Sequence, residues 1–187
     1  MFTMESVKAG LTGVKADVYD RVRAYVNAHG TIMQRDQARH SIFLSGSFGS
    51  GKTTLGVAAL KALCWARVET GRGDAAPTFE KFYTFTRCVQ AGYSDGTASA
   101  TLQGIQRAPL LMLDDVGDLE RSRTETDDKR ALLYEVLDYR SDHFLPTILT
   151  TNLSADGLSE AFGARTFERI LEMSALIELG GENLRLL

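Results

Sequence analysis

The residues best suited to chemistry form a glycine-rich loop. Gly46-Ser47-Phe48-Gly49-Ser50-Gly51-Lys52-Thr53 matches the pattern G-x-x-x-x-G-K-[ST] at every fixed position. Glycines let a main chain turn and bring bare N–H groups against phosphate oxygens. Lys52 would reach the β- and γ-phosphates, and the Thr53 hydroxyl would ligate Mg²⁺. The loop, together with Thr54, therefore predicts a site for ATP.

The segments around this loop have the order that such a site needs. Ser41 to Ser45 is a short apolar run that predicts a buried strand, and Leu55 to Arg67 predicts a helix. A helix that starts at the loop turns its free N–H groups and positive dipole end toward the phosphates.

Two carboxylates follow a second apolar run. Leu110 to Leu113 predicts a strand, and Asp114 and Asp115 come directly after it. Ligands of open α/β sheets bind at the carboxyl ends of the strands. We therefore expect Asp114 to hold Mg²⁺ and Asp115 to orient or deprotonate an attacking water. The alternative is a solvated turn at the end of a strand.

An amide ends the next predicted strand, Thr147 to Thr151. This strand can lie between the loop strand and the acidic strand, so that Asn152 points between Asp115 and the γ-phosphate. There an amide can hold the nucleophilic water. An asparagine that only caps a turn is the alternative.

Two arginines, Arg165 and Arg169, lie four residues apart and share one face of a predicted helix. One reading is an arginine finger, which stabilises transition-state charge in a neighbouring subunit. The other is a solvated helix face with Glu168 and Glu172 nearby.

The remaining pattern predicts the elements that position these residues. Strands alternating with helices indicate an α/β fold, a parallel sheet flanked by helices on both faces. The other expected elements are a helix with Val14, Val18, Val22 and Val26 on one face that stops at His29-Gly30, a strand at Phe82 to Phe85, a helix from Thr86 to Ala91, a polar stretch from Ser94 to Ala100, a helix from Arg130 to His143 that carries Leu133, Val136, Leu137 and Arg140, a short helix capped by Ser154, a helix from Arg165 to Met173, and a strand from Ala175 to Leu179.

Composition narrows the class of protein. With 187 residues, 44% of them hydrophobic, the chain suits one compact domain. A net charge of −3 argues against a generic polyanion binder, so any nucleic-acid contact would need a local patch. No apolar run predicts a membrane span or signal peptide, and Cys64 and Cys88 predict reduced thiols in a cytoplasmic protein.

As a series, these motifs resemble the AAA+ ATPases of the DnaC/DnaI helicase-loader and IstB group. The resemblance covers roughly residues 40 to 187 and rests on GSFGSGKT, LLMLDDVGD, LDYRSDHFLP, TILTTNLS, GARTFERI and ALIELGGENLR. It implies a P-loop core at residues 41–187, preceded by a helical segment at 1–40 and without a C-terminal helical lid. It also implies ATP·Mg²⁺ binding and slow hydrolysis.

The resemblance further assigns roles by position. Lys52 and Thr53 correspond to the Walker A ligands, and Asp114 and Asp115 correspond to the Walker B pair. Asn152 corresponds to sensor 1. Arg169 corresponds to the trans-acting arginine, with Arg165 in support and Arg185 a weaker candidate. Many hydrolytic relatives carry Glu where this chain has Asp115, one methylene shorter.

The implied partners are single-stranded DNA, further copies of the chain in a helical or ring-like oligomer, and a replicative helicase, in a bacterial or phage-infected cell. A helper ATPase for DNA transposition, acting with a transposase, is the main alternative. A nucleotide-gated interaction module with little hydrolysis and a small-molecule kinase are others. Lys81, Arg87 and Arg107 are candidate DNA contacts, although scattered solvated charges explain them equally well.

Overall fold

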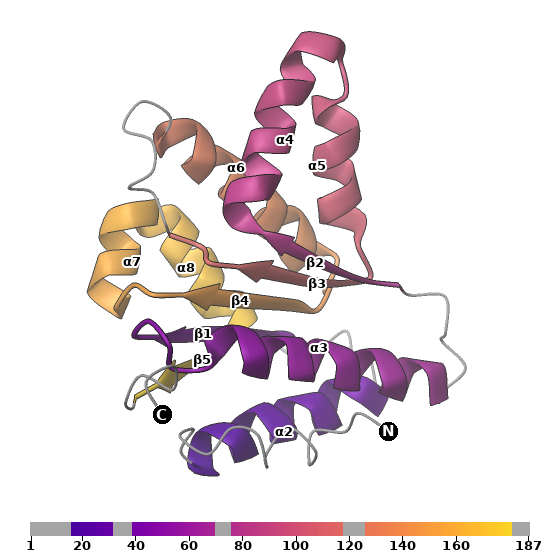
Figure 1. Ribbon diagram of the computed structural model, residues 1–187, viewed down its shortest axis with the longest axis vertical. Coiled ribbons are helices and arrows are strands. Elements are labelled where there is room, and N and C mark those ends of the chain that lie inside the picture. The colour runs from indigo at the N-terminus through magenta and orange to yellow at the C-terminus, as the bar shows by residue number, and fades with distance from the viewer. Residues whose placement is uncertain (1–15, 32–38, 70–75, 118–125, 181–187) are drawn as a thin grey trace.

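A computed structural model describes residues 16–31, 39–69, 76–117 and 126–180. Five parallel strands form one sheet in the order β2-β3-β4-β1-β5, which confirms the expected α/β class (Figure 1). The elements are α2 (Ala16–Thr31), β1 (Ser41–Gly46), α3 (Lys52–Glu69), β2 (Pro77–Lys81), α4 (Phe82–Asp95), α5 (Ala98–Arg107), β3 (Leu110–Asp114), α6 (Thr126–Asp142), β4 (Thr147–Thr151), α7 (Ala155–Phe162), α8 (Ala164–Met173) and β5 (Ser174–Leu179).

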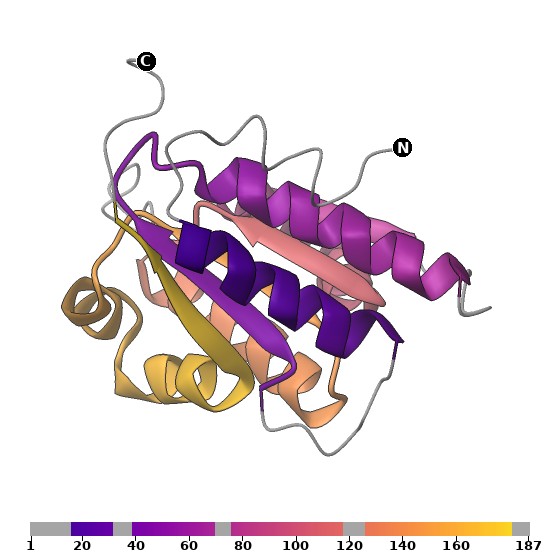
Figure 2. The ribbon, with the colours of Figure 1, turned by 90° about the horizontal axis from the view of Figure 1, so that it is seen from below.

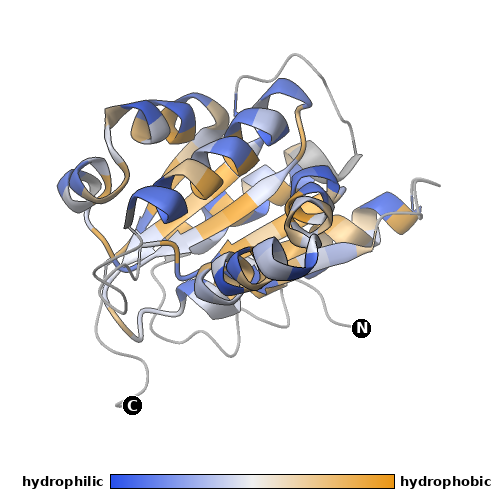
Figure 3. Ribbon diagram, turned by 90° about the horizontal axis from the view of Figure 1, so that it is seen from above, coloured by the Kyte–Doolittle hydropathy of each residue, from blue (hydrophilic) through white to orange (hydrophobic). Residues whose placement is uncertain are grey.

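Consecutive strand residues point to opposite faces of the sheet, and both faces are buried. Ile42 and Leu44 pack with the core under α2 and α3, whereas Phe43 packs with the core under α4 to α8. Figure 2 shows α2 and α3 side by side over the first face. The mainly hydrophobic strands lie between helices that carry both hydrophilic and hydrophobic residues (Figure 3). This double cover explains the consecutive apolar residues in each central strand.

The second predicted strand was wrong. Phe82 to Phe85 is the first turn of α4, and the edge strand β2 runs just before it, from Pro77 to Lys81. Phe82, Phe85 and Val89 are all buried, at the i, i+3, i+7 spacing of a helix. The aromatic residues that favoured a strand are thus the core side of a helix.

The helix α5 was missed because its sequence is rich in Ala, Ser and Thr. It lies partly in the stretch expected to be polar loop, and only Ala98 and Ile105 are buried in it. It begins just after Gly96, which ends α4 in the left-handed conformation with φ 79°. The two helices extend together from the β2 edge of the sheet (Figure 1).

The other predicted elements are confirmed within a few residues. Val18, Val22 and Val26 are buried on one side of α2, which ends one residue beyond Gly30, while Val14 lies outside the described residues. Ser154 caps α7, since its Oγ accepts a hydrogen bond from the Gly157 amide at 3.2 Å. None of the helices in the described ranges is long and apolar enough to cross a membrane.

A buried arginine joins the end of α6 to two other segments. Arg140 has no exposed surface. Its Nη1 donates to the carbonyls of Ile105, Gln106 and Ala108 at 3.1, 3.1 and 2.7 Å. Its Nε donates to the Thr147 hydroxyl at 2.8 Å, and its Nη2 donates to the Pro146 carbonyl at 2.8 Å. The guanidinium therefore ties the end of α5 to the start of β4.

Candidate nucleotide site

The phosphate loop connects β1 to α3 through three glycines with positive φ. Gly46, Gly49 and Gly51 have φ angles of 149°, 77° and 88°. A Cβ added at Gly46 would lie 2.4 Å from the Leu179 carbonyl oxygen, so this position has no room for a side chain. All three glycines are thus favoured by backbone conformation, and Gly46 is also required by its close packing against β5.

Lys52, the first residue of α3, is bent back over the loop. Its Nζ donates to the carbonyls of Gly46 and Ser47 at 2.9 and 2.7 Å and to the Ser50 Oγ at 3.4 Å. The side chain is therefore positioned beside the loop where phosphates are expected. Phe48, in the same loop, is 70% exposed. Thr54 is exposed in the first turn of α3.

Asp114, at the end of β3, receives hydrogen bonds from two hydroxyls. The Thr53 Oγ1 donates to its Oδ1 at 2.8 Å, and the Thr150 Oγ1 donates to the same oxygen at 2.6 Å. The structure thus brings together the two predicted metal ligands, Thr53 from the loop and Asp114 from the acidic strand. Thr150 is a residue of this site that the sequence motifs do not predict.

Asp115 follows in the left-handed region, with φ 60°. Its amide donates to the Thr150 Oγ1 at 2.9 Å, and its Oδ1 accepts a hydrogen bond from the Asn152 Nδ2 at 2.8 Å. As expected, β4 lies between β1 and β3, and Asn152 contacts Asp115. The sequence marks Thr150 only as a hydroxyl residue near the end of a predicted strand, because its contact with Asp115 spans 35 residues.

The donor set suits Mg²⁺. Thr53 and Asp114 supply a hydroxyl and a carboxylate 2.8 Å apart, and both are hard oxygen ligands. No cluster of three or more His, Cys, Asp or Glu side chains that could hold a metal occurs in the described ranges. Mg²⁺ at a phosphate site needs no such cluster, because it is held by one or two carboxylates together with the substrate phosphates.

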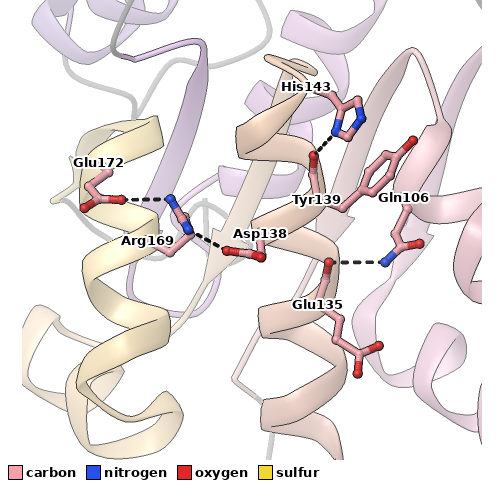
Figure 4. Close-up of polar contacts among 7 residues, drawn as sticks. All are labelled: Gln106, Glu135, Asp138, Tyr139, His143, Arg169 and Glu172. Atoms are coloured by element: carbon pink, nitrogen blue, oxygen red, sulfur yellow. Dashed lines mark hydrogen bonds and ion pairs between the residues drawn. The ribbon is translucent and has the colours of Figure 1, made fainter.

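The two predicted arginines lie on α8 and contact α6 within the same chain. Arg169 lies between Asp138 and Glu172, with its guanidinium 2.5 and 3.1 Å from their carboxylates (Figure 4). The Arg165 guanidinium lies 4.7 Å from the Tyr134 ring centroid. The side chain of Arg169 is 27% exposed. Arg185 lies outside the described residues.

The candidate DNA-contacting residues are exposed, and one has an aromatic neighbour. Lys81 and Arg107 lie at the start of α4 and the end of α5. Arg87 stands 5.8 Å from the centroid of the Tyr83 ring, and the Lys129 ammonium lies 5.8 Å from the same ring. This group joins α4 to the first turn of α6.

A family model described as "IstB-like ATP binding protein" matches residues 31–187. This chain belongs to the IstB-like ATP-binding family. A sequence relative from Bacillus subtilis (strain 168), named replicative helicase loader DnaI, is 28% identical over 94% of this chain. The phage-like element PBSX protein XkdC of the same organism is 28% identical over 87%. The family member described here spans 58% and 59% of their respective lengths.

Solved structures support the fold of this IstB-like chain. The crystal structure of the DnaC helicase loader has a TM-score of 0.71 at 23% identity, over 89% of this chain and 93% of that one. The crystal structure of DnaI has a TM-score of 0.67 at 24% identity, over 89% and 87%. The predicted membership of the AAA+ group that contains DnaC, DnaI and IstB is therefore confirmed.

Proposed function

We propose that this chain is an ATPase that binds ATP with Mg²⁺, hydrolyses it slowly, and acts as a helicase loader that assembles on single-stranded DNA. The observation that carries the proposal is the hydrogen-bonded network that joins Thr53, Asp114, Asp115 and Asn152 at the carboxyl ends of β1, β3 and β4. Three segments that are distant in sequence converge there on one set of carboxylate oxygens, beside the phosphate loop.

The network divides into binding and hydrolytic parts. Lys52 and the loop amides bind the phosphates, and Thr53 with Asp114 would hold Mg²⁺. Bound Mg²⁺ would offset the charge on the phosphate oxygens. Asp115 would accept the proton of the attacking water, while Asn152 orients Asp115 through the amide contact of 2.8 Å. Since aspartate is one methylene shorter than glutamate, the water must lie closer to β3.

A second subunit would complete the site. Arg169 is the candidate trans-acting group, and Arg165 would support it. In the single chain Arg169 pairs with Asp138 and Glu172, so the assembly must redirect or share these ion pairs.

Single-stranded DNA would contact the surface near β2. The Tyr83 ring can stack with a base, while the exposed Arg87 beside it can neutralise a phosphate. The relative named as a replicative helicase loader supports a replicative helicase as the partner over the transposase of the transposition-helper alternative.

The direct test is size-exclusion chromatography with light scattering, with and without a non-hydrolysable ATP analogue and single-stranded DNA. We expect oligomers only when both are present, and phosphate release that DNA stimulates. Assembly without nucleotide, or DNA binding unaffected by ATP, would contradict the loader proposal. Nucleotide-dependent assembly of the unchanged chain without phosphate release would instead favour the nucleotide-gated module, the alternative based on aspartate rather than glutamate at position 115.

A further inference from the structure

We infer that Thr150 is a positioning residue of the nucleotide site, whose hydroxyl sets the orientation of both aspartates and thereby tunes Mg²⁺-dependent binding of ATP. The inference rests on the proposed function, because it concerns how the same site holds its metal. Thr150 itself need not touch nucleotide or metal. It acts through Asp114 and Asp115.

The Thr150 hydroxyl both donates and accepts a hydrogen bond. A hydroxyl has one donor and two acceptor positions. The Thr150 Oγ1 donates to Asp114 Oδ1 at 2.6 Å and accepts from the Asp115 amide at 2.9 Å. The first distance is in the range of a bond to an ionised carboxylate. Thr150 is 1% exposed, so these protein groups take the place of water around the hydroxyl.

The main chain of β3 depends on the same side chain. The regular pairing of β3 with β4 ends at Leu113 and Leu149. The next amide that contacts β4, that of Asp115, donates to the side chain of Thr150 rather than to a carbonyl. The amide of Val116 then donates to the Thr150 carbonyl at 2.8 Å. One residue of β4 thus receives two consecutive amides from the turn that follows β3.

The contacts with Thr150 hold Asp115 in an unusual conformation. Its φ of 60° is uncommon for a residue with a side chain, although aspartate tolerates it better than most. The hydroxyl of Thr150 fixes the main chain of Asp115, and Asn152, just after the end of β4, holds the carboxylate at 2.8 Å. Two side chains at the carboxyl end of β4 therefore hold both the main chain and the side chain of Asp115.

Asp114 is fixed from two sides in a similar way. Its Oδ1 accepts from Thr53 on α3 and from Thr150 on β4. Two donors from different elements restrict rotation of the carboxylate. Loss of the Thr150 hydroxyl would leave Thr53 as the single hydroxyl donor of this pair and remove the acceptor for the Asp115 amide. The metal site would then be less well organised before nucleotide arrives.

The test compares Thr150→Val with Thr150→Ser in the full chain. Valine keeps the β-branched shape without a hydroxyl, whereas serine keeps the hydroxyl. Each variant would be titrated with a fluorescent ATP analogue, once in Mg²⁺ and once in EDTA. The Mg²⁺ gain is the affinity in Mg²⁺ divided by the affinity in EDTA. We expect Thr150→Val to reduce this gain at least about fivefold, with affinity in EDTA within about twofold, and Thr150→Ser to retain it.

Thr86→Val is the matched control, because Thr86 is also fully buried and its hydroxyl donates to the Tyr83 carbonyl at 3.0 Å, on α4. The Mg²⁺ gain of Thr86→Val should equal that of the unchanged chain. This result would separate the general effect of losing a buried hydroxyl from the specific effect of losing the Thr150 hydroxyl. Thr150→Cys, a much weaker donor, replaces the valine variant if circular dichroism shows that variant to be unfolded.

Each outcome decides the assignment. An unaltered Mg²⁺ gain in Thr150→Val, or a serine variant no better than valine, would overturn it while the proposed ATP binding stands. Nucleotide binding without any Mg²⁺ gain in the unchanged chain would also overturn it. Failure of the unchanged chain to bind nucleotide at all would refute the proposed function itself, and this inference with it.

Discussion

The two ends of the central strands organise polar groups in opposite ways. At the carboxyl ends, Asp115 and Asn152 are partly exposed and lie beside the phosphate loop, where a ligand can reach them. At the amino end of β4, Arg140 is completely buried, and five oxygen atoms of the chain surround its guanidinium. The first network is open toward a ligand, whereas the second is closed and serves the fold.

The closed network keeps its charge at neutral pH. Burial lowers the pKa of Arg140 to about 9, against a small opposing effect of Tyr25. This value is still above neutral pH, so the guanidinium remains protonated and keeps all of its donors. Burial also raises the pKa of Tyr25, whose hydroxyl donates to the His40 carbonyl at 2.7 Å. We therefore assign stability mainly to this end of the sheet and ligand binding to the other.

The largest effect is expected from a substitution that breaks the closed network. Arg140→Met should lower the free energy of unfolding by about 3–5 kcal/mol, because it leaves the carbonyls around the guanidinium buried without a donor. The measurement is urea denaturation, with the m-value unchanged. Arg107→Met, at the exposed end of α5, is the control and should change stability by less than about 0.5 kcal/mol. Equal loss in both variants would contradict the assignment.

A substitution at the open network should change the affinity for ATP rather than the free energy of unfolding. Lys52→Ala should weaken ATP binding at least about 100-fold, or about 2.7 kcal/mol, since it removes the charge opposite the phosphates. Isothermal titration measures this change. Lys61→Ala, exposed on the same helix, is the control and should bind ATP normally. An unchanged affinity of Lys52→Ala for ATP would contradict the assignment of the phosphate loop.

The same contrast explains what the sequence could predict. The phosphate loop, the aspartate pair and Asn152 follow local patterns, each at the end of an apolar strand, so their convergence could be inferred from the parallel sheet alone. The two contacts of the Thr150 hydroxyl depend on the end of a neighbouring strand and the turn after it, 35 residues away for the Asp115 contact. Only the tertiary structure reveals such a contact.

Arg140 shows a related limit. The helical spacing correctly placed it on the same faces as buried leucines, but three of its five acceptors lie 32 to 35 residues earlier in the chain. The position of the edge strand was predicted wrongly for a different reason. Strand β2 pairs with a neighbour on one side only, and none of its residues is fully buried. The buried aromatic residues of α4 therefore gave a stronger signal for a strand than β2 itself.

A third change tests whether the open network extends into a neighbouring subunit. Arg169→Ala should leave ATP binding nearly intact but lower turnover at least about tenfold, and mixing it with Asp115→Ala should restore part of the activity. Phosphate release at fixed total protein measures this. Asp138→Asn is the control, because it weakens the ion pair within the chain but keeps the arginine. No recovery in the mixture would argue that Arg169 acts only in its own chain.

The smallest effect concerns the surface outside both networks. Tyr83→Leu should weaken single-stranded DNA binding by about three- to tenfold while ATP affinity is unchanged, because leucine keeps an apolar side chain but cannot stack with a base. Arg87→Gln should instead reduce the salt dependence of binding, since one phosphate contact is lost. Fluorescence anisotropy at several salt concentrations separates the two effects. Tyr93→Leu is the matched control, because Tyr93 lies on the same helix and is 70% exposed. If Tyr93→Leu weakened DNA binding as much as Tyr83→Leu, the cation-flanked ring would lose its special role, and the contact surface would have to lie farther along α4.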